Sequence, residues 1–215
     1  MAPPEFRDRG GARTVGAGGD NVGVSNVAVG ELAWDALASP VGEISVACSA
    51  AGLARVGFGP PPFRPGPAGG RPGEPSGAAG AHLDAALAQL TEYFAGQRRA
   101  FDLPVDWPGM SPAQRQVLPV LLASAGYGQT VTYGELARRS GLADGSTTVP
   151  AARVAGQIMG SNPCAIIVPC HRVVAGDGLG GYSGGTGIEV KRWLLIFEGA
   201  LPPTLDWDAS GPGVS

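Results

Sequence analysis

The sequence predicts an α/β N-terminal domain followed by a mainly α C-terminal domain that contains a helix-turn-helix, in a chain of 215 residues. Two neighbouring segments within residues 44–58 have the composition of short β-strands, and residues 81–95 have the spacing of one helix. From residue 112 to 198 the apolar pattern is instead that of several short helices separated by glycine. Strands followed by helices therefore favour one unit with a small sheet and one that is largely helical.

Compositional bias marks the segments that we expect to lie outside these two cores. Residues 1–32 and 202–215 lack sustained periodicity, so we predict that both are disordered tails. Residues 60–80 are rich in proline and glycine, which predicts a flexible loop without helix or strand. The folded domains are then 33–107 and 108–201.

The first domain is predicted to consist of a β-hairpin and a helix. A turn over residues 39–43 precedes the strand 44–48, and Ala51-Gly52 separates that strand from 53–58. The helix 81–95 ends before Gly96, and residues 101–105 have the composition of one more strand.

The second domain is predicted to begin with a helix capped by Ser111 that ends near residue 125. Thr132 and Glu135 have the spacing of a capping box before a short helix, 135–140. A second short helix, 151–159, follows Pro150 and completes the helix-turn-helix candidate. A glycine-rich loop over 175–185 and a last helix, 190–198, end the domain.

The chemistry is expected at Cys170 and His171, directly after an apolar run, 166–168, that predicts a buried strand. A reactive cysteine needs a base or a positive potential that favours its thiolate, and His171 and Arg172 are adjacent. Neighbouring side chains of an extended segment point apart, so we expect a water between Cys170 and His171. Glu198, a carboxylate beside an apolar helix, is the candidate partner of the histidine. The alternatives are a buried structural cysteine and a solvent-facing glutamate.

Cysteine use and charge limit the other classes of function. Cys48, Cys164 and Cys170 cannot all pair and form no CxxC motif, so we expect free thiols and a reducing, cytoplasmic setting. No leader or membrane-spanning segment is predicted. We expect no metal and no cofactor, because Cys48 and His82 are isolated in the first domain. The net charge is −3, but residues 110–200 carry seven basic and five acidic side chains, which permits a polyanionic partner.

Five blocks of the second domain together resemble the signature of the methylated-DNA–protein-cysteine methyltransferases, which repair O6-alkylguanine. They are Asn162-Pro163, Pro169-Cys170-His171-Arg172-Val173, Gly181-Tyr182-Ser183-Gly184-Gly185, Lys191-Arg192-Trp193-Leu194-Leu195 and Glu198-Gly199. The resemblance covers about residues 110–200, with weaker similarity in the hairpin of the first domain. It implies an RNase H-like first domain and a winged-helix-like second domain.

The resemblance also implies the role of each residue. Cys170 would accept the alkyl group irreversibly from O6-alkylguanine or O4-alkylthymine, while His171 and Glu198 promote the thiolate and Tyr133 assists departure of the base. The partner implied is double-stranded DNA, bound in its minor groove by a monomer that flips the damaged base. Arg153 would replace that base in the stack, and Arg172 would hold structure and charge around the loop. The residues expected at the DNA or the base are Arg153, Asn162, Arg172, Val173, Tyr182, Ser183 and Gly184.

Three other functions remain open on the sequence. A non-enzymatic sensor of alkylated DNA would share the fold but carry tryptophan at the nucleophile position. A helix-turn-helix regulator would need more side chains able to read bases than Arg153 and Gln157 provide. A cysteine hydrolase would turn over and need an oxyanion hole. The loops at 144–149 and 186–188 and the linker around residues 60–80 are longer than the family pattern implies.

Overall fold

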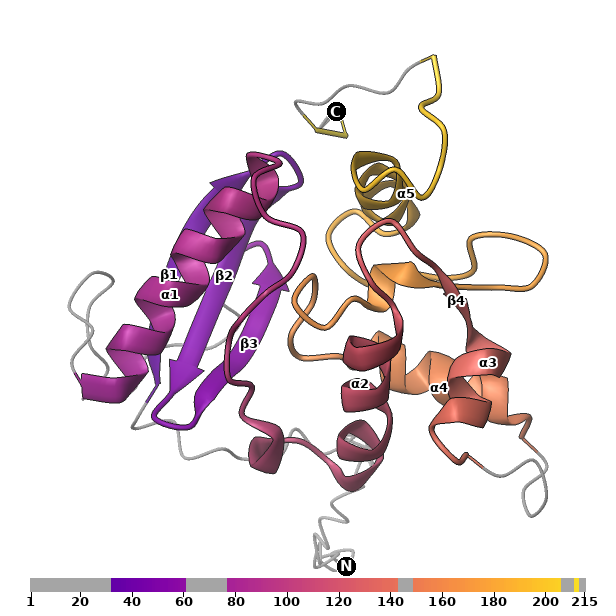
Figure 1. Cartoon of the computed structure of the whole chain (residues 1–215), viewed down its shortest axis with the longest axis horizontal. Helices are drawn as coiled ribbons and strands as arrows, with labels where there is room; N and C mark the ends of the chain where they lie inside the picture. The colour runs from indigo at the N-terminus through magenta and orange to yellow at the C-terminus, as the bar shows by residue number, and fades with distance from the viewer. Residues whose placement is uncertain (1–31, 61–76, 143–148, 206–210, 213–215) are drawn as a thin grey trace, which may run out of the picture.

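The computed structural model describes residues 32–60, 77–142, 149–205 and 211–212. It shows a three-stranded sheet with one long helix on it, beside a second unit built from four shorter helices (Figure 1). The predicted fold class, a small sheet with a helix followed by a mainly helical unit, is therefore confirmed. The N-terminal tail, most of the loop 60–80, most of the loop 144–149 and part of the C-terminal tail lie outside the described residues.

The sheet of the first domain has the order β1-β2-β3 and is antiparallel throughout. Its strands are β1 (Ala33–Ser39), β2 (Gly42–Ser49) and β3 (Gly52–Phe58). The predicted hairpin is β2–β3. The strand β1 was not predicted, because its sequence, AWDALAS, contains no β-branched residue.

The helix α1 (Gly77–Phe94) packs against the sheet, and Figure 1 shows it lying along the strands. Leu83, Ala86, Leu90 and Tyr93 are fully buried on its inner face. The helix starts at Gly77, so the prediction of a non-helical loop up to residue 80 was wrong at its end. Packing of this long apolar face against the sheet offsets the entropy that glycines lose in the first turn.

The predicted strand 101–105 is also wrong. Only Val105 forms a bridge, to Leu53, and the rest of this segment runs as an irregular connection. The 3-10 turn η1 (Trp107–Gly109) follows, capped by Asp106, whose carboxylate also accepts a hydrogen bond from Ser49 at 2.7 Å. The connection is thus tied to the sheet before the second domain begins.

The second domain begins with α2 (Pro112–Ser124), α3 (Tyr133–Arg139) and α4 (Ala151–Gly160). α3 and α4 pack together as the predicted helix-turn-helix pair. Ser111 caps α2 as predicted. At α3 Thr132 accepts a hydrogen bond from the Glu135 amide, but the Glu135 carboxylate pairs with two arginines, so the predicted capping box is only half formed.

The remaining elements hold the Cys-His segment in the second domain. The 3-10 turn η2 (Cys170–Arg172) leads into β5 (Val173–Val174), which pairs in parallel with β4 (Val131–Thr132). The last helix, α5 (Ile188–Phe197), agrees with the prediction and places Glu198 at its C-terminal cap.

The apolar run 166–168 is buried as expected, but it is not a strand. It forms consecutive turns, in which the amides of Ile167 and Val168 bond to the carbonyls of Ala165 and Cys164. Ile166 has a φ of 71°, a left-handed conformation that β-branched residues rarely adopt. The segment is apolar because it is buried. A turn inside the core buries its side chains as completely as a strand does, so composition alone does not distinguish the two.

The two domains share one core and one line of backbone pairing. The Val56 amide donates to the Pro163 carbonyl at 2.8 Å, and the Ala165 amide donates to the Val56 carbonyl at 3.2 Å. The segment that leads to Cys170 therefore pairs with the free edge of β3.

Candidate active site

A cavity of about 870 Å³ opens between α3, α4 and the glycine-rich loop. Tyr133 lines it from α3, and Arg153 and Met159 from α4. Cys170 and Tyr182 complete the wall. The helix pair and the predicted nucleophile thus meet at one hollow.

Cys170 lines this cavity, and the residue is only 6% exposed. Burial raises its pKa, and the nearby side chains of Asn162 and Tyr182, with the ammonium of Lys191, act in the opposite direction. The Tyr182 hydroxyl is buried and makes no hydrogen bond of ordinary length within the described residues, so its effect on the thiol is that of a longer contact. Since burial dominates, Cys170 rests as a thiol and needs a base to become a nucleophile.

His171 is fully buried and turns its Nε2 atom toward Glu198 Oε1, at 3.0 Å. Burial lowers the pKa of this histidine, in opposition to the raising effect of Glu198. A neutral ring that donates from Nε2 carries a lone pair on Nδ1. The buried Nδ1 atom has no hydrogen-bond partner among the described residues, so it is available to accept a proton.

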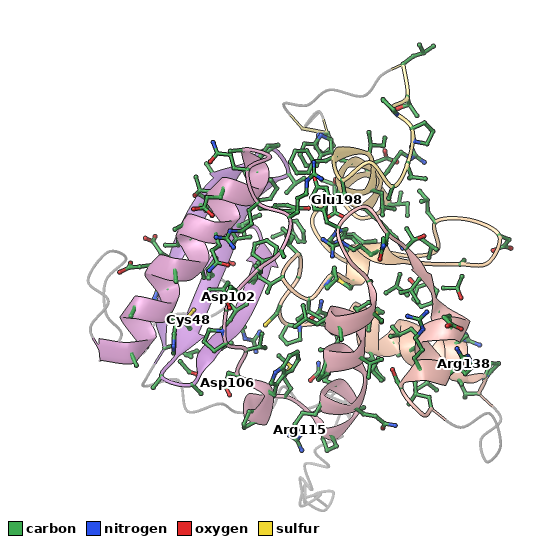
Figure 2. All side chains as sticks on the ribbon, viewed as in Figure 1. Cys48, Asp102, Asp106, Arg115, Arg138 and Glu198 are labelled. Carbon is green, nitrogen blue, oxygen red and sulfur yellow. The ribbon has the colours of Figure 1, made fainter. Side chains whose placement is uncertain are left out.

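Glu198 is 5% exposed, so the interpretation as a solvent-facing helix end is wrong. Both of its oxygens accept hydrogen bonds from the Arg172 guanidinium, at 2.8 Å each. Burial opposes ionisation, but the hydrogen bonds from His171 and Arg172 outweigh it and hold the pKa of Glu198 below its ordinary value. Figure 2 places Glu198 beside α5, where the two domains face each other.

The structure buries Arg172 behind Cys170 rather than at the cavity. Its guanidinium is buried and bound to Glu198, and it also donates to the Ala125 carbonyl at 2.7 Å. These contacts support the expectation that Arg172 holds structure and charge, and they leave its guanidinium engaged inside the protein.

Tyr133, the first residue of α3, is half-buried at the cavity and donates from its hydroxyl to the Gly181 carbonyl at 3.2 Å. Burial, with a smaller contribution from Cys170, raises its pKa. The phenol therefore keeps its proton at neutral pH and can donate a hydrogen bond to a ligand in the cavity.

The other predicted binding residues divide between the cavity and its supports. Arg153 is exposed on α4 at the cavity, and Ser183 lines the cavity while its hydroxyl donates to the Gly160 carbonyl at 3.2 Å. Asn162 and Gly184 lie instead in an adjoining hollow of about 290 Å³, which also reaches Cys170. Val173 is buried in β5 and lines neither hollow.

Two residues to which the sequence assigned no role belong to the site. Lys191 is fully buried, and its ammonium donates to the carbonyls of Val173, Leu179 and Gly181 at 2.6, 2.5 and 3.1 Å. Burial lowers its pKa to about 8, so it is still mainly charged at neutral pH. Tyr93, from the first domain, donates to Glu198 at 2.7 Å. The sequence did hold one indication for Lys191, because a lysine on the apolar side of a helix needs polar partners.

The described ranges contain no group of three or more His, Cys, Asp or Glu side chains that could hold a metal ion. Within the same ranges, no helix has the length and apolar character needed to cross a membrane. His82, at the first domain, has its Nδ1 atom 3.1 Å from the Ser49 carbonyl.

Comparison with known proteins gives matches over both domains. A model described as 6-O-methylguanine DNA methyltransferase, ribonuclease-like domain, matches residues 32–107, and the DNA binding domain of the same description matches 112–200. The chain is 43% identical to a DNA base-flipping protein of Thermus thermophilus over 51% of its own length and 68% of the relative's. It is 45% identical to a methylated-DNA–protein-cysteine methyltransferase of Mycobacterium bovis, over 55% of its length and 66% of the relative's.

A solved structure supports the same likeness over a larger share of the chain. The structure titled Mycobacterium tuberculosis OGT in complex with DNA matches with a TM-score of 0.61 and 34% identity. The match covers 78% of the present chain and 92% of that one. The curated mycobacterial relative, in contrast, is matched over slightly less than two thirds of its length.

Proposed function

Because the chain belongs to the 6-O-methylguanine DNA methyltransferase family, we propose that it repairs DNA directly, by moving an alkyl group from the O6 atom of guanine to Cys170. The observation that carries this proposal is the position of the Cys170 thiol at a cavity of about 870 Å³, directly before the buried group of His171, Glu198 and Arg172. A thiol held there is accessible to a ligand that enters the cavity but sheltered from bulk water.

The proposed step is one displacement. His171 Nδ1 takes the thiol proton through a water, and Glu198 stabilises the imidazolium that forms. The thiolate attacks the alkyl carbon, so that the S–C bond forms as the O6–C bond breaks. The electron pair of the broken bond stays on guanine, and the Tyr133 hydroxyl stabilises it by donating a hydrogen bond or a proton. The product is an S-alkylcysteine, and each protein molecule reacts once.

Tyr133 must exchange partners in this scheme, since its hydroxyl donates to the Gly181 carbonyl. Gly181 O also accepts from Lys191, so that carbonyl retains a donor when the tyrosine turns toward a base. The exchange therefore leaves no orphaned acceptor in the loop.

The thiol cannot meet a base inside a stacked duplex, so the proposal includes base flipping. Arg153, exposed beside the cavity on α4, would enter the stack as the base leaves. We place α4 in the minor groove, and we include O4-alkylthymine as a second substrate. Action as a monomer and a cytoplasmic location belong to the same proposal, and the three free cysteines support a reducing compartment.

A second candidate is a protein that flips alkylated bases without repairing them. The observation that favours it is the similarity to the DNA base-flipping protein of Thermus thermophilus. The thiol of Cys170 lies at the cavity, and the next residue, His171, is a buried imidazole that can act as a general base. This arrangement favours alkyl transfer over binding alone.

Intact-protein mass after incubation with a duplex that contains O6-methylguanine tests the proposal. We expect one methyl addition, mapped to the peptide of Cys170, with protein and repaired base in equal amounts. Cys170→Ala serves as the control and should bind the duplex without gaining mass. Binding by the wild type without a mass change would establish the base-flipping candidate instead. Continued turnover would indicate a hydrolase, and sequence-dependent binding of undamaged duplex would indicate a regulator.

A further inference from the structure

Among the residues that the structure describes, Tyr93 is the side chain of the N-terminal domain that hydrogen-bonds to the Glu198 carboxylate. This tyrosine lies in the last turn of α1, is fully buried, and donates from its hydroxyl to Glu198 Oε1 at 2.7 Å. The contact joins residues that are 105 positions apart in the chain. Through it the first domain contacts the charged groups behind Cys170.

We propose that Tyr93 is a positioning residue for alkyl transfer, whose hydroxyl fixes the Glu198 carboxylate and sets the basicity of His171. This inference rests on the proposed function of Cys170. It gives the sheet domain a part in the chemistry, although none of the described residues of that domain lines the larger cavity.

The first support is the number of donors on one oxygen atom. Oε1 of Glu198 accepts from His171 Nε2 at 3.0 Å, Arg172 Nη2 at 2.8 Å and Tyr93 Oη at 2.7 Å. The shortest of the three is therefore the tyrosine contact. Each donor draws on the negative charge of Oε1, so the tyrosine reduces the share that acts on the imidazole.

The second support is that the Tyr93 side chain is held in one position. Its ring packs against Phe94, Phe101, Tyr127 and Phe197, with centroids 5.1 to 6.2 Å apart. Burial, followed by the charge of Glu198, raises the pKa of the phenol well above its ordinary value. The hydroxyl is thus a permanent donor, held by a rigid aromatic cluster, and water has no access to replace it.

The charged groups around His171 define what removal of this hydroxyl would do. Glu198 favours the imidazolium, whereas Arg172 and Lys191 disfavour it. Without the tyrosine donor, Oε1 would carry more charge toward His171 Nε2, and the pKa of the histidine would rise. The carboxylate would also be held by one fewer contact, which should slow proton transfer from the thiol.

The test compares Tyr93→Phe with Tyr127→Phe. Tyr127 belongs to the same aromatic cluster, and its hydroxyl donates to the Phe197 carbonyl at 3.2 Å rather than to Glu198. Both variants lose one hydroxyl and keep the ring. Single-turnover transfer from a duplex with O6-methylguanine is followed across pH, with thermal unfolding as the measure of folding.

We expect Tyr93→Phe to slow transfer about ten- to a hundredfold, the effect of losing one hydrogen bond to a charged group. The acid limb of its pH profile should move to higher pH, and Tyr127→Phe should match the wild type in both respects. Equal rates and equal profiles for Tyr93→Phe and the wild type would overturn the inference. So would equal losses in the two variants, since this would indicate a general effect of the cluster.

A second readout does not depend on transfer at all. The chain has only two histidines, so nuclear magnetic resonance can follow the ring of His171 with His82 as an internal reference. Tyr93→Phe should raise the pKa of His171 and leave His82 unchanged. An unmoved His171 would refute the role of Tyr93 even if the wild type proved inactive on alkylated DNA. Absence of transfer by the wild type would refute the proposed function alone.

Discussion

Arg172 and Glu198 form a bidentate ion pair inside the protein, with Arg172 Nε 2.8 Å from Glu198 Oε2 and Arg172 Nη2 2.8 Å from Glu198 Oε1. Both side chains are almost fully buried, and together they are close to electrically neutral. This compensation explains how His171 can rest uncharged beside a carboxylate. The pair also predicts which substitutions the fold will tolerate least.

Arg172→Met should destabilise the protein by about 3–5 kcal/mol, because it leaves a buried carboxylate without its main partner. Urea unfolding measures the difference. Arg138→Met provides a matched control, since Arg138 forms an ion pair with Glu135 at the surface, where solvent screens the attraction and little stability is lost. Comparable losses of unfolding free energy in the two variants would show that the buried ion pair stabilises the protein no more than the surface pair does.

Glu198 should make stability depend on pH in the acid range. Its folded pKa lies below the ordinary value of 4.5, so its contribution is complete above pH 4.5 and is lost as the pH falls through the lower folded value. In that window one such group gives a slope of about 1.4 kcal/mol per pH unit. Glu198→Gln should flatten the slope, whatever its effect on absolute stability. The same substitution at the exposed Glu189 should not.

Lys191→Met should loosen the glycine-rich loop and cost about 2 kcal/mol, since three carbonyls lose their common donor. Hydrogen exchange of residues 175–185 should rise selectively, and transfer should slow because Gly181 no longer meets Tyr133 in a fixed position. Uniform exchange across the whole chain would instead indicate global unfolding. Arg192→Met, a neighbour in α5 with an exposed partner, is the control.

Gly184→Ala should reduce stability by about 1–3 kcal/mol and slow transfer, by overpacking the smaller hollow. An added Cβ would lie 2.5 Å from Phe58 and 2.7 Å from Tyr182, so the rings must move, and Tyr182 lines the hollow with Cys170. Gly178→Ala meets no atom within 4 Å and should behave as the wild type. A harmless Gly184→Ala would mean that Phe58 shifts without cost.

Arg153→Ala should slow repair of a duplex about tenfold, because extrusion of a base costs a few kcal/mol and each 1.4 kcal/mol is a factor of ten. Reaction with a free alkylated base should be unaffected. Arg98→Ala, which removes a basic side chain from the first domain, is the control. Equal losses on duplex and free base would show that Arg153 acts in the pocket rather than in flipping.

Much of the fold, and the residues that meet at the candidate site, could be predicted from the sequence. Caps and glycine stops located α2, α4 and α5, and the adjacency of Cys170 and His171 in a resembling block indicated the candidate site. These signals are local, because a cap or a terminator acts on residues within one turn of itself.

The errors have a common physical origin in tertiary contacts. The run 166–168 is apolar because it is buried, and burial alone does not distinguish a strand from a turn. β1 pairs with β2 despite weak propensity, since the sheet supplies its partner. The contact from Tyr93 to Glu198 spans the two domains, so no spacing within either segment could have revealed it.

The pairing of Val56 with Pro163 and Ala165 bears on attempts to produce either half of the molecule alone. An excised N-terminal domain would present the border of β3 with unpaired amides and carbonyls, a template for addition of strands from other chains. We expect such a fragment to self-associate in a concentration-dependent manner. A usable minimal version would need a proline or a charged side chain introduced along that border.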